Sequence, residues 1–116
     1  MTFNELLGFV NEQDRYLVER FGHTVSTKNE IVFARMIKLM EELGELSNEV
    51  LASNGDQRAD KLVAYDRQNL AHEVADVLIV TLLLAKSLDI DVKQALEAKI
   101  DKIRRRQQKD TLVPTI

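Results

Sequence analysis

The sequence has no cysteine, no tryptophan, one proline and four glycines in 116 residues. The absence of cysteine excludes disulfides, thiolate zinc sites and cysteine nucleophiles. Because helix-breaking residues are so few, long helices are expected. The longest nearly unbroken apolar run, residues 77–85, is too short to span a bilayer. The first residues also lack the charged-then-apolar pattern of a secretion signal. These absences predict a soluble, cytoplasmic protein with no membrane partner.

The composition and length fit one globular domain. Hydrophobic residues make up 45% of the chain and charged residues 30%, values typical of folded and not of disordered proteins. A chain of this length can bury one core but not two. We therefore expect a single all-α domain over residues 1–110, followed by a short tail over residues 111–116.

Hydrophobic periodicity and capping patterns predict four helices and no strand. Capping boxes open the first two helices, at Thr2 with Glu5 and at Thr27 with Glu30. The third helix could begin at Asp60 or at Asp66, and we place its start near residue 62. The predicted helices of this bundle-like, all-α fold cover residues 3–21, 28–52, 62–88 and 91–108.

Two acidic pairs are the main functional signal. Glu42 and Glu45 are three residues apart, as are Glu73 and Asp76, so each pair projects from one helix face. The second pair lies in a helix that is apolar on nearly every side. If the two helices pack antiparallel, all four carboxylates can meet, and like charges about 4 Å apart repel by several kcal/mol. Oxygen ligands on rigid helices suit Mg²⁺, with Mn²⁺ as the alternative.

The acidic residues have other interpretations. The Glu-rich flank over residues 41–49 could simply be solvated. A di-iron site needs a Glu-x-x-His from each of two helices, and the sequence has none. It also has no Gly-x-Ser-x-Gly nucleophile elbow and no Gly-rich phosphate loop. Phosphates would therefore be held by a metal ion and by side chains.

The predicted last helix carries the bases that could do this. Residues 99–109 hold six Lys or Arg against one Asp. Such a basic segment is either a nucleic-acid tail or a local anion site. No aromatic residue is interleaved with these bases, which weakens the nucleic-acid interpretation.

At this point the chain resembles a known family. Glu41-Glu42-x-x-Glu45 followed by Glu73-x-x-Asp76 is similar to the signature of the MazG-like nucleotide pyrophosphohydrolases, an all-α family related to the dimeric dUTPases. The resemblance covers roughly residues 30–108. Lys38 before the acids also fits, and Lys99-x-x-Lys102-x-x-Arg105 is similar to the basic pattern that these proteins carry on their last helix.

The resemblance implies a Mg²⁺-dependent hydrolase that converts a (d)NTP to the (d)NMP and pyrophosphate, in nucleotide-pool housecleaning. It implies that Glu41 and Glu42 are catalytic, Glu41 binding a further metal or orienting the attacking water. The metal ligands would be Glu42, Glu45, Glu73 and Asp76. The triphosphate would be held by Lys38, Lys99, Lys102, Arg105 and Arg106.

The family also implies self-association as a homodimer or homotetramer, with active sites near subunit boundaries. Two other functions stay open at this stage. One is a non-catalytic helical module that binds metal and a partner. The other is a nucleic-acid-associated protein that uses the basic C-terminal segment.

Overall fold

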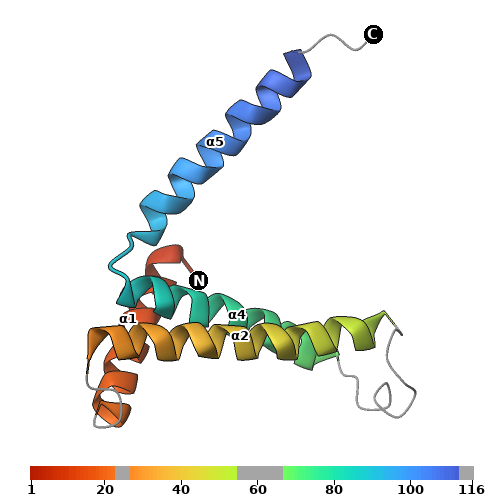
Figure 1. Cartoon of the computed structure of the whole chain (residues 1–116). Helices are drawn as coiled ribbons and strands as arrows, with labels where there is room; N and C mark the ends of the chain where they lie inside the picture. The colour runs from red at the N-terminus through yellow and green to blue at the C-terminus, as the bar shows by residue number, and fades with distance from the viewer. Residues whose placement is uncertain (23–26, 55–66, 113–116) are drawn as a thin grey trace.

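A computed structural model describes residues 1–22, 27–54 and 67–112 (Figure 1). Four helices account for nearly all of these residues, and the described parts of the chain contain no strand. The helices are α1 (Phe3–Phe21), α2 (Lys28–Ser53), α4 (Arg67–Ser87) and α5 (Val92–Leu112). The all-α prediction is confirmed.

The predicted boundaries need two comments. Residues 62–66, where the third helix was expected to begin, lie outside the described residues, and the described helix ends at Ser87. The last helix was expected to end at residue 108, but it continues to Leu112. No Gly or Pro interrupts residues 92–112, and Pro114 is the first residue to disfavour helical backbone, at the position before it. Two residues assigned to the tail therefore belong to α5, and residues 113–116 lie outside the described part.

The expected N-terminal caps are present. The side-chain oxygen of Thr2 accepts a hydrogen bond from the backbone N–H of Glu5 at 3.1 Å. Thr27 accepts one from the N–H of Glu30 at the same distance. Each bond satisfies an amide that the first helical turn leaves without a partner. The residues that begin α1 and α2 were therefore readable from sequence alone.

The turn from α4 to α5 contains the one described non-glycine residue with positive φ. Asp89 has a φ of 57°, the left-handed conformation in which helices often end. Its carboxylate also forms an ion pair with Lys28 at the start of α2. Asp91 then caps α5, since its Oδ1 accepts a hydrogen bond from the N–H of Gln94 at 3.0 Å. The turn thus connects the end of α4 with the starts of α2 and α5.

Helices α2 and α4 form the central pair of the fold, and α1 packs against α4 (Figure 1). The pair is antiparallel, because Arg35 early in α2 contacts Leu83 late in α4, whereas Glu42 meets Glu73 and Asp76 earlier in α4. This arrangement is the one needed for the two acidic pairs to face each other.

Few apolar side chains are fully covered within the described chain. The buried ones are Val10 of α1 and Val80 and Leu83 of α4. Helix α5 extends away from the other helices (Figure 1), and Ile100 on its apolar stripe is 45% exposed. Helix α4, expected to be the most covered element, still leaves Leu78 60% exposed. None of the described helices has the length and apolar character needed to cross a membrane.

Candidate metal centre

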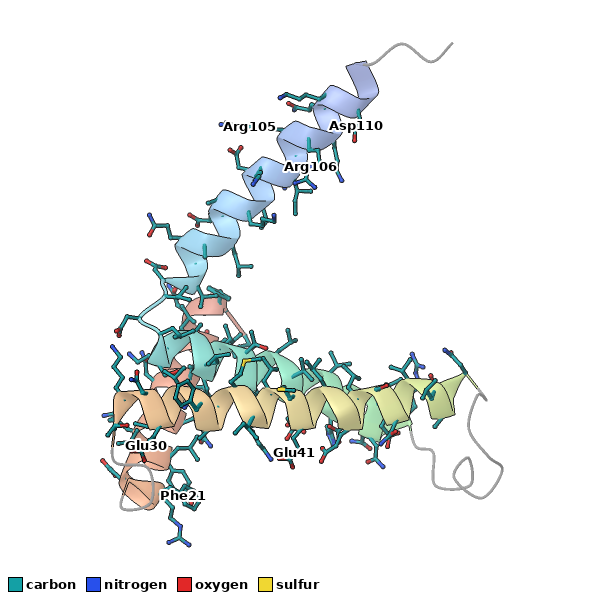
Figure 2. The ribbon with its side chains drawn as sticks, viewed as in Figure 1. Phe21, Glu30, Glu41, Arg105, Arg106 and Asp110 are labelled. Carbon is teal, nitrogen blue, oxygen red and sulfur yellow. The ribbon has the colours of Figure 1, made fainter. Side chains whose placement is uncertain are left out.

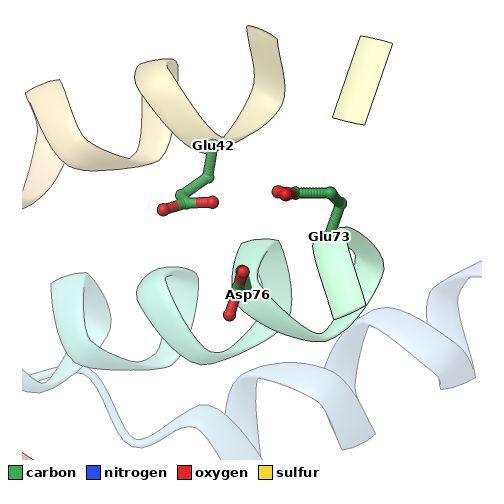
Figure 3. A group of neighbouring side chains, drawn as sticks. All are labelled: Glu42, Glu73 and Asp76. Carbon is green, nitrogen blue, oxygen red and sulfur yellow. The ribbon is translucent and has the colours of Figure 1, made fainter. Parts of the chain in front are cut away.

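Three carboxylates from the central helix pair converge on one point. Glu42 of α2 and Glu73 and Asp76 of α4 each place an oxygen within 4.8 Å of the others (Figure 3). Glu73 and Asp76 reach this point from one face of α4 because they are three residues apart. Glu42 comes from the opposite helix. The acidic cluster is therefore assembled by tertiary packing of elements far apart in the sequence.

Two of these carboxylates are held away from water. Glu42 is only 6% exposed. One oxygen of Glu42 and one of Glu73, Oε2 in each case, are buried and have no hydrogen-bond partner among the described residues. An ionised oxygen left in this state costs several kcal/mol of desolvation. A cation in contact with both oxygens would remove that cost.

The carboxyl group of Glu73 also shows the cost of burying a negative charge without a cation. Burial, followed by the negative charges of Glu45, Glu42 and Asp76, raises the pKa of its carboxyl group to about 7. Without a cation, this group therefore holds a proton near neutral pH that an ordinary glutamate would have lost.

The remaining acids of α2 lie beside this cluster. Glu45 is exposed and lies outside the 4.8 Å group, but its charge acts on Glu73. Glu49, one turn further on, also has a buried Oε2 with no partner in the described chain. Glu41 is exposed (Figure 2), and its Oε1 lies 3.4 Å from Nζ of Lys38.

Lys38 forms ion pairs with two acids of α2 at the edge of the cluster. Its Nζ lies 3.3 Å from Oε1 of Glu42 as well as 3.4 Å from Glu41. The bond to Glu42 is the largest of the influences that raise the pKa of Lys38. The ammonium group is thus held in its charged form at the edge of the cluster.

The basic residues of α5 are not brought to the acids. Arg105 and Arg106 lie on the part of α5 that extends away from α2, where Glu41 is found (Figure 2). Arg105 is paired with Asp101 of its own helix, at 3.0 Å. Lys99 and Lys102 lie on the same exposed helix. Their predicted role in holding a triphosphate stays a prediction.

Arg35 is a residue of this region that the sequence analysis did not single out. It is 7% exposed, and its Nη1 donates to the backbone carbonyl of Leu83 at 3.1 Å and contacts Oδ1 of Asp14 at 2.7 Å. The signal was available, because Arg35 lies three residues before Lys38 on the same flank of α2. It ties α1, α2 and α4 together beside the cluster.

The donor set suits a hard divalent cation. Carboxylate oxygens from rigid helices are ligands of Mg²⁺ and Mn²⁺, and no described histidine joins the group. The two buried oxygens without partners are the observation that favours a bound ion over a merely solvated acidic flank.

The chain is similar in sequence to known proteins. The family model described as the MazG nucleotide pyrophosphohydrolase domain matches residues 34–110. Over 75 residues the chain is 37% identical to an uncharacterized protein, YpjD, of Bacillus subtilis (strain 168). That match covers 65% of this chain and 66% of the relative, just under two thirds of the relative's length. No solved structure matches significantly. From the family match, which spans both acidic pairs, the chain belongs to the MazG nucleotide pyrophosphohydrolase family.

Proposed function

We propose that this chain is a metal-dependent nucleoside triphosphate pyrophosphohydrolase that converts a (d)NTP and water to the (d)NMP and pyrophosphate. One observation carries the proposal: Glu42, Glu73 and Asp76 converge within 4.8 Å, and two of them have buried oxygens without partners. Family membership supports the same reaction class.

Glu42, Glu73 and Asp76 would hold Mg²⁺ or Mn²⁺, with Glu45 as a further ligand from the adjacent turn of α2. A bound divalent ion supplies charge neutralisation for the phosphates and positions the water that attacks. The charge on Glu45 already acts on Glu73, and for this reason we assign Glu45 as the further ligand.

The other groups of α2 would act on the water and the phosphates. Glu41 is exposed and adjoins the cluster, so we assign it the role of orienting the attacking water and accepting its proton. Lys38, kept charged by Glu42 and Glu41, would contact the phosphate oxygens that become more negative as the anhydride bond breaks.

Pyrophosphate release from a panel of (d)NTPs, with and without Mg²⁺, tests the proposal. We expect turnover that disappears with EDTA and falls at least about a hundredfold in Glu42→Gln and in Glu73→Gln. Glu12→Gln, which changes an exposed acid of α1, is the matched control and should leave turnover unchanged. Full activity in both cluster variants would overturn the assignment.

The same experiment separates the alternative of a non-catalytic metal-binding module. Such a protein would bind Mg²⁺ through the cluster, as judged by calorimetry, and would lose that binding in Glu73→Gln, but would release no pyrophosphate from any nucleotide. The nucleic-acid alternative predicts binding that weakens steeply with salt and needs no metal.

A further inference from the structure

A cavity of about 500 Å³ lies directly beside the metal centre. It lies among α1, α2 and α4, and its lining includes Glu42, Asp76 and Lys38 at one end. The volume falls within the range of about 300–1,000 Å³ typical of small-molecule sites. A ligand that reaches the acids can therefore extend into this partly open cavity.

Most of the cavity wall is apolar. It is formed by side chains such as Leu17 and Phe21 of α1, Ile31 of α2 and Ile79 and Val80 of α4. An apolar wall of this kind suits the faces of a planar ring, which lose water on entering it. In a nucleotide, the part with such planar faces is the base.

Arg35, like Gln13 and Lys38, is a polar residue that lines this cavity. The guanidinium group lines the cavity, and its side chain is 9% exposed. Its contacts with the Leu83 carbonyl and with Asp14 both use Nη1. A guanidinium carries five N–H groups, so the group has further donors to offer a ligand.

The register of α2 gives the separation between the two ends of the cavity. Arg35 precedes Glu42 by seven residues, which is two helical turns, or about 10 Å along the axis at 1.5 Å per residue. A nucleoside unit spans a similar length from its α-phosphate to the far edge of its base. A nucleotide with its phosphates at Glu42 thus brings the base edge to Arg35.

We propose that Arg35, positioned by Asp14 and the Leu83 carbonyl, selects nucleotides whose base carries a ring carbonyl, such as uracil or thymine, over those with an amino group there. This inference rests on the proposed function and adds the substrate class. A guanidinium can donate but cannot accept. It therefore pairs with the O4 of uracil, whereas the 4-amino group of cytosine faces it with another donor and leaves both unpaired.

The test compares dUTP with dCTP, which differ in this edge and share the sugar and phosphates. We expect kcat/KM with Mg²⁺ to favour dUTP by about tenfold or more. Arg35→Lys keeps a cation for Asp14 but loses the fork of donors, and should reduce that preference at least about fivefold, mainly by raising KM for dUTP. Glu12→Gln is the control that should keep the full preference.

A double variant controls for misfolding caused by an unpaired buried charge. Arg35→Met combined with Asp14→Leu removes both charges together, so that neither is left buried alone. This double variant should hydrolyse dUTP and dCTP with similar efficiency. A wild-type preference below about twofold, or one unchanged in Arg35→Lys, would overturn the inference while leaving the proposed function intact.

Two further outcomes are decided by other measurements. If no nucleotide is hydrolysed, the proposed function fails, and an NMR titration with the uncharged nucleosides deoxyuridine and deoxycytidine then tests the cavity itself. Chemical-shift changes at Arg35 with deoxyuridine only would support the selection. Equal changes with both nucleosides would overturn it. If Arg35→Lys changes the sedimentation coefficient but not the nucleotide preference, the cavity belongs to a contact between subunits and the inference is wrong.

Discussion

Glu42 and Glu73 face each other across the antiparallel pair α2 and α4, with carboxylate oxygens within 4.8 Å. Each keeps one buried oxygen without a hydrogen-bond partner in the described chain. In a fold with few covered apolar side chains, such a pair works against stability.

The stability of the metal-free chain should fall as pH rises from about 4.5 to about 7. The folded chain holds the Glu73 proton up to a pKa of about 7, whereas the unfolded chain loses it near 4.5. The folded state therefore binds more protons across this window, and the free energy of unfolding decreases with pH. Urea unfolding in EDTA at several pH values measures the slope.

Mg²⁺ competes with that proton, so its stabilising effect should grow over the same pH range. In Glu73→Gln the side chain cannot titrate, and the slope assigned to Glu73 should disappear. A wild-type stability that is flat or rises between pH 4.5 and 7, after correction for this variant, would contradict the prediction.

Glu42→Gln should stabilise the metal-free protein by about 1 kcal/mol while removing metal binding. Above about pH 7, where Glu73 is ionised, the uncharged amide can donate a hydrogen bond to Glu73, so repulsion is replaced by attraction. The loss of the ion pair with half-exposed Lys38 costs little. Urea unfolding in EDTA, with Glu12→Gln as the reference, provides the measurement.

With saturating Mg²⁺ the order should reverse, because only the wild type gains the binding free energy. A Glu42→Gln chain less stable than wild type under both conditions would show that Glu42 is a structural residue and not a metal ligand.

The chain should form homodimers or homotetramers. Phe33, Ile37 and Met40 follow one another on one face of α2 and are 63%, 65% and 62% exposed. Contiguous apolar surface of this kind usually marks an interface. Sedimentation velocity should give two or four subunit masses for the wild type and a smaller species for Ile37→Lys with Met40→Lys. Val18→Lys, also an exposed apolar residue at 40% but on α1, is the control. A wild-type monomer at micromolar concentration would refute the prediction.

Two glycines of α1 should respond to alanine with opposite signs. A methyl group on Gly22, which caps the C-terminus of α1, would overlap the backbone carbonyl oxygen of Val18. Because backbone cannot move aside cheaply, Gly22→Ala should lower the free energy of unfolding by about 1–3 kcal/mol. At Gly8 a methyl group meets nothing within 4 Å, so Gly8→Ala should raise it by about 0.5–1 kcal/mol. Chemical denaturation of both variants gives the comparison, and equal signs would refute it.

The helices were predictable from sequence because their signals are local. Thr2 and Thr27 each cap the helix that they were expected to start, Asp91 caps α5 in the same way, and each cap is made within four residues. The end of α5 was placed too early because nothing between residue 108 and Pro114 forces a stop, and periodicity alone does not fix an end.

The candidate site was predictable only in part, for a geometric reason. Spacing put Glu73 and Asp76 on one face of a helix, and an antiparallel neighbour brings Glu42 to them. Spacing could not give the rotation of α2. The apolar side chain of Met36 is 43% exposed, while the charged Arg35 beside it is buried. That rotation is set by which side chains of α4 and α1 fit against α2, which are contacts between distant parts of the chain.

The sequence of charges along one flank of α2 has a consequence for the order of binding. From the amino end, two cations, Arg35 and Lys38, precede three acids, Glu42, Glu45 and Glu49. The peptide dipole of the helix is positive at the same end, so backbone and side chains add to one field. A free nucleotide would be drawn phosphates-first toward the cations, with its base turned to the acids. A divalent ion held by Glu42, Glu73 and Asp76 would offset part of this negative charge and would allow the phosphates to bind at the acidic end. The ion would thus set the orientation of the bound nucleotide. An excess of nucleotide over metal should inhibit hydrolysis, because the metal-free nucleotide binds in the reverse orientation.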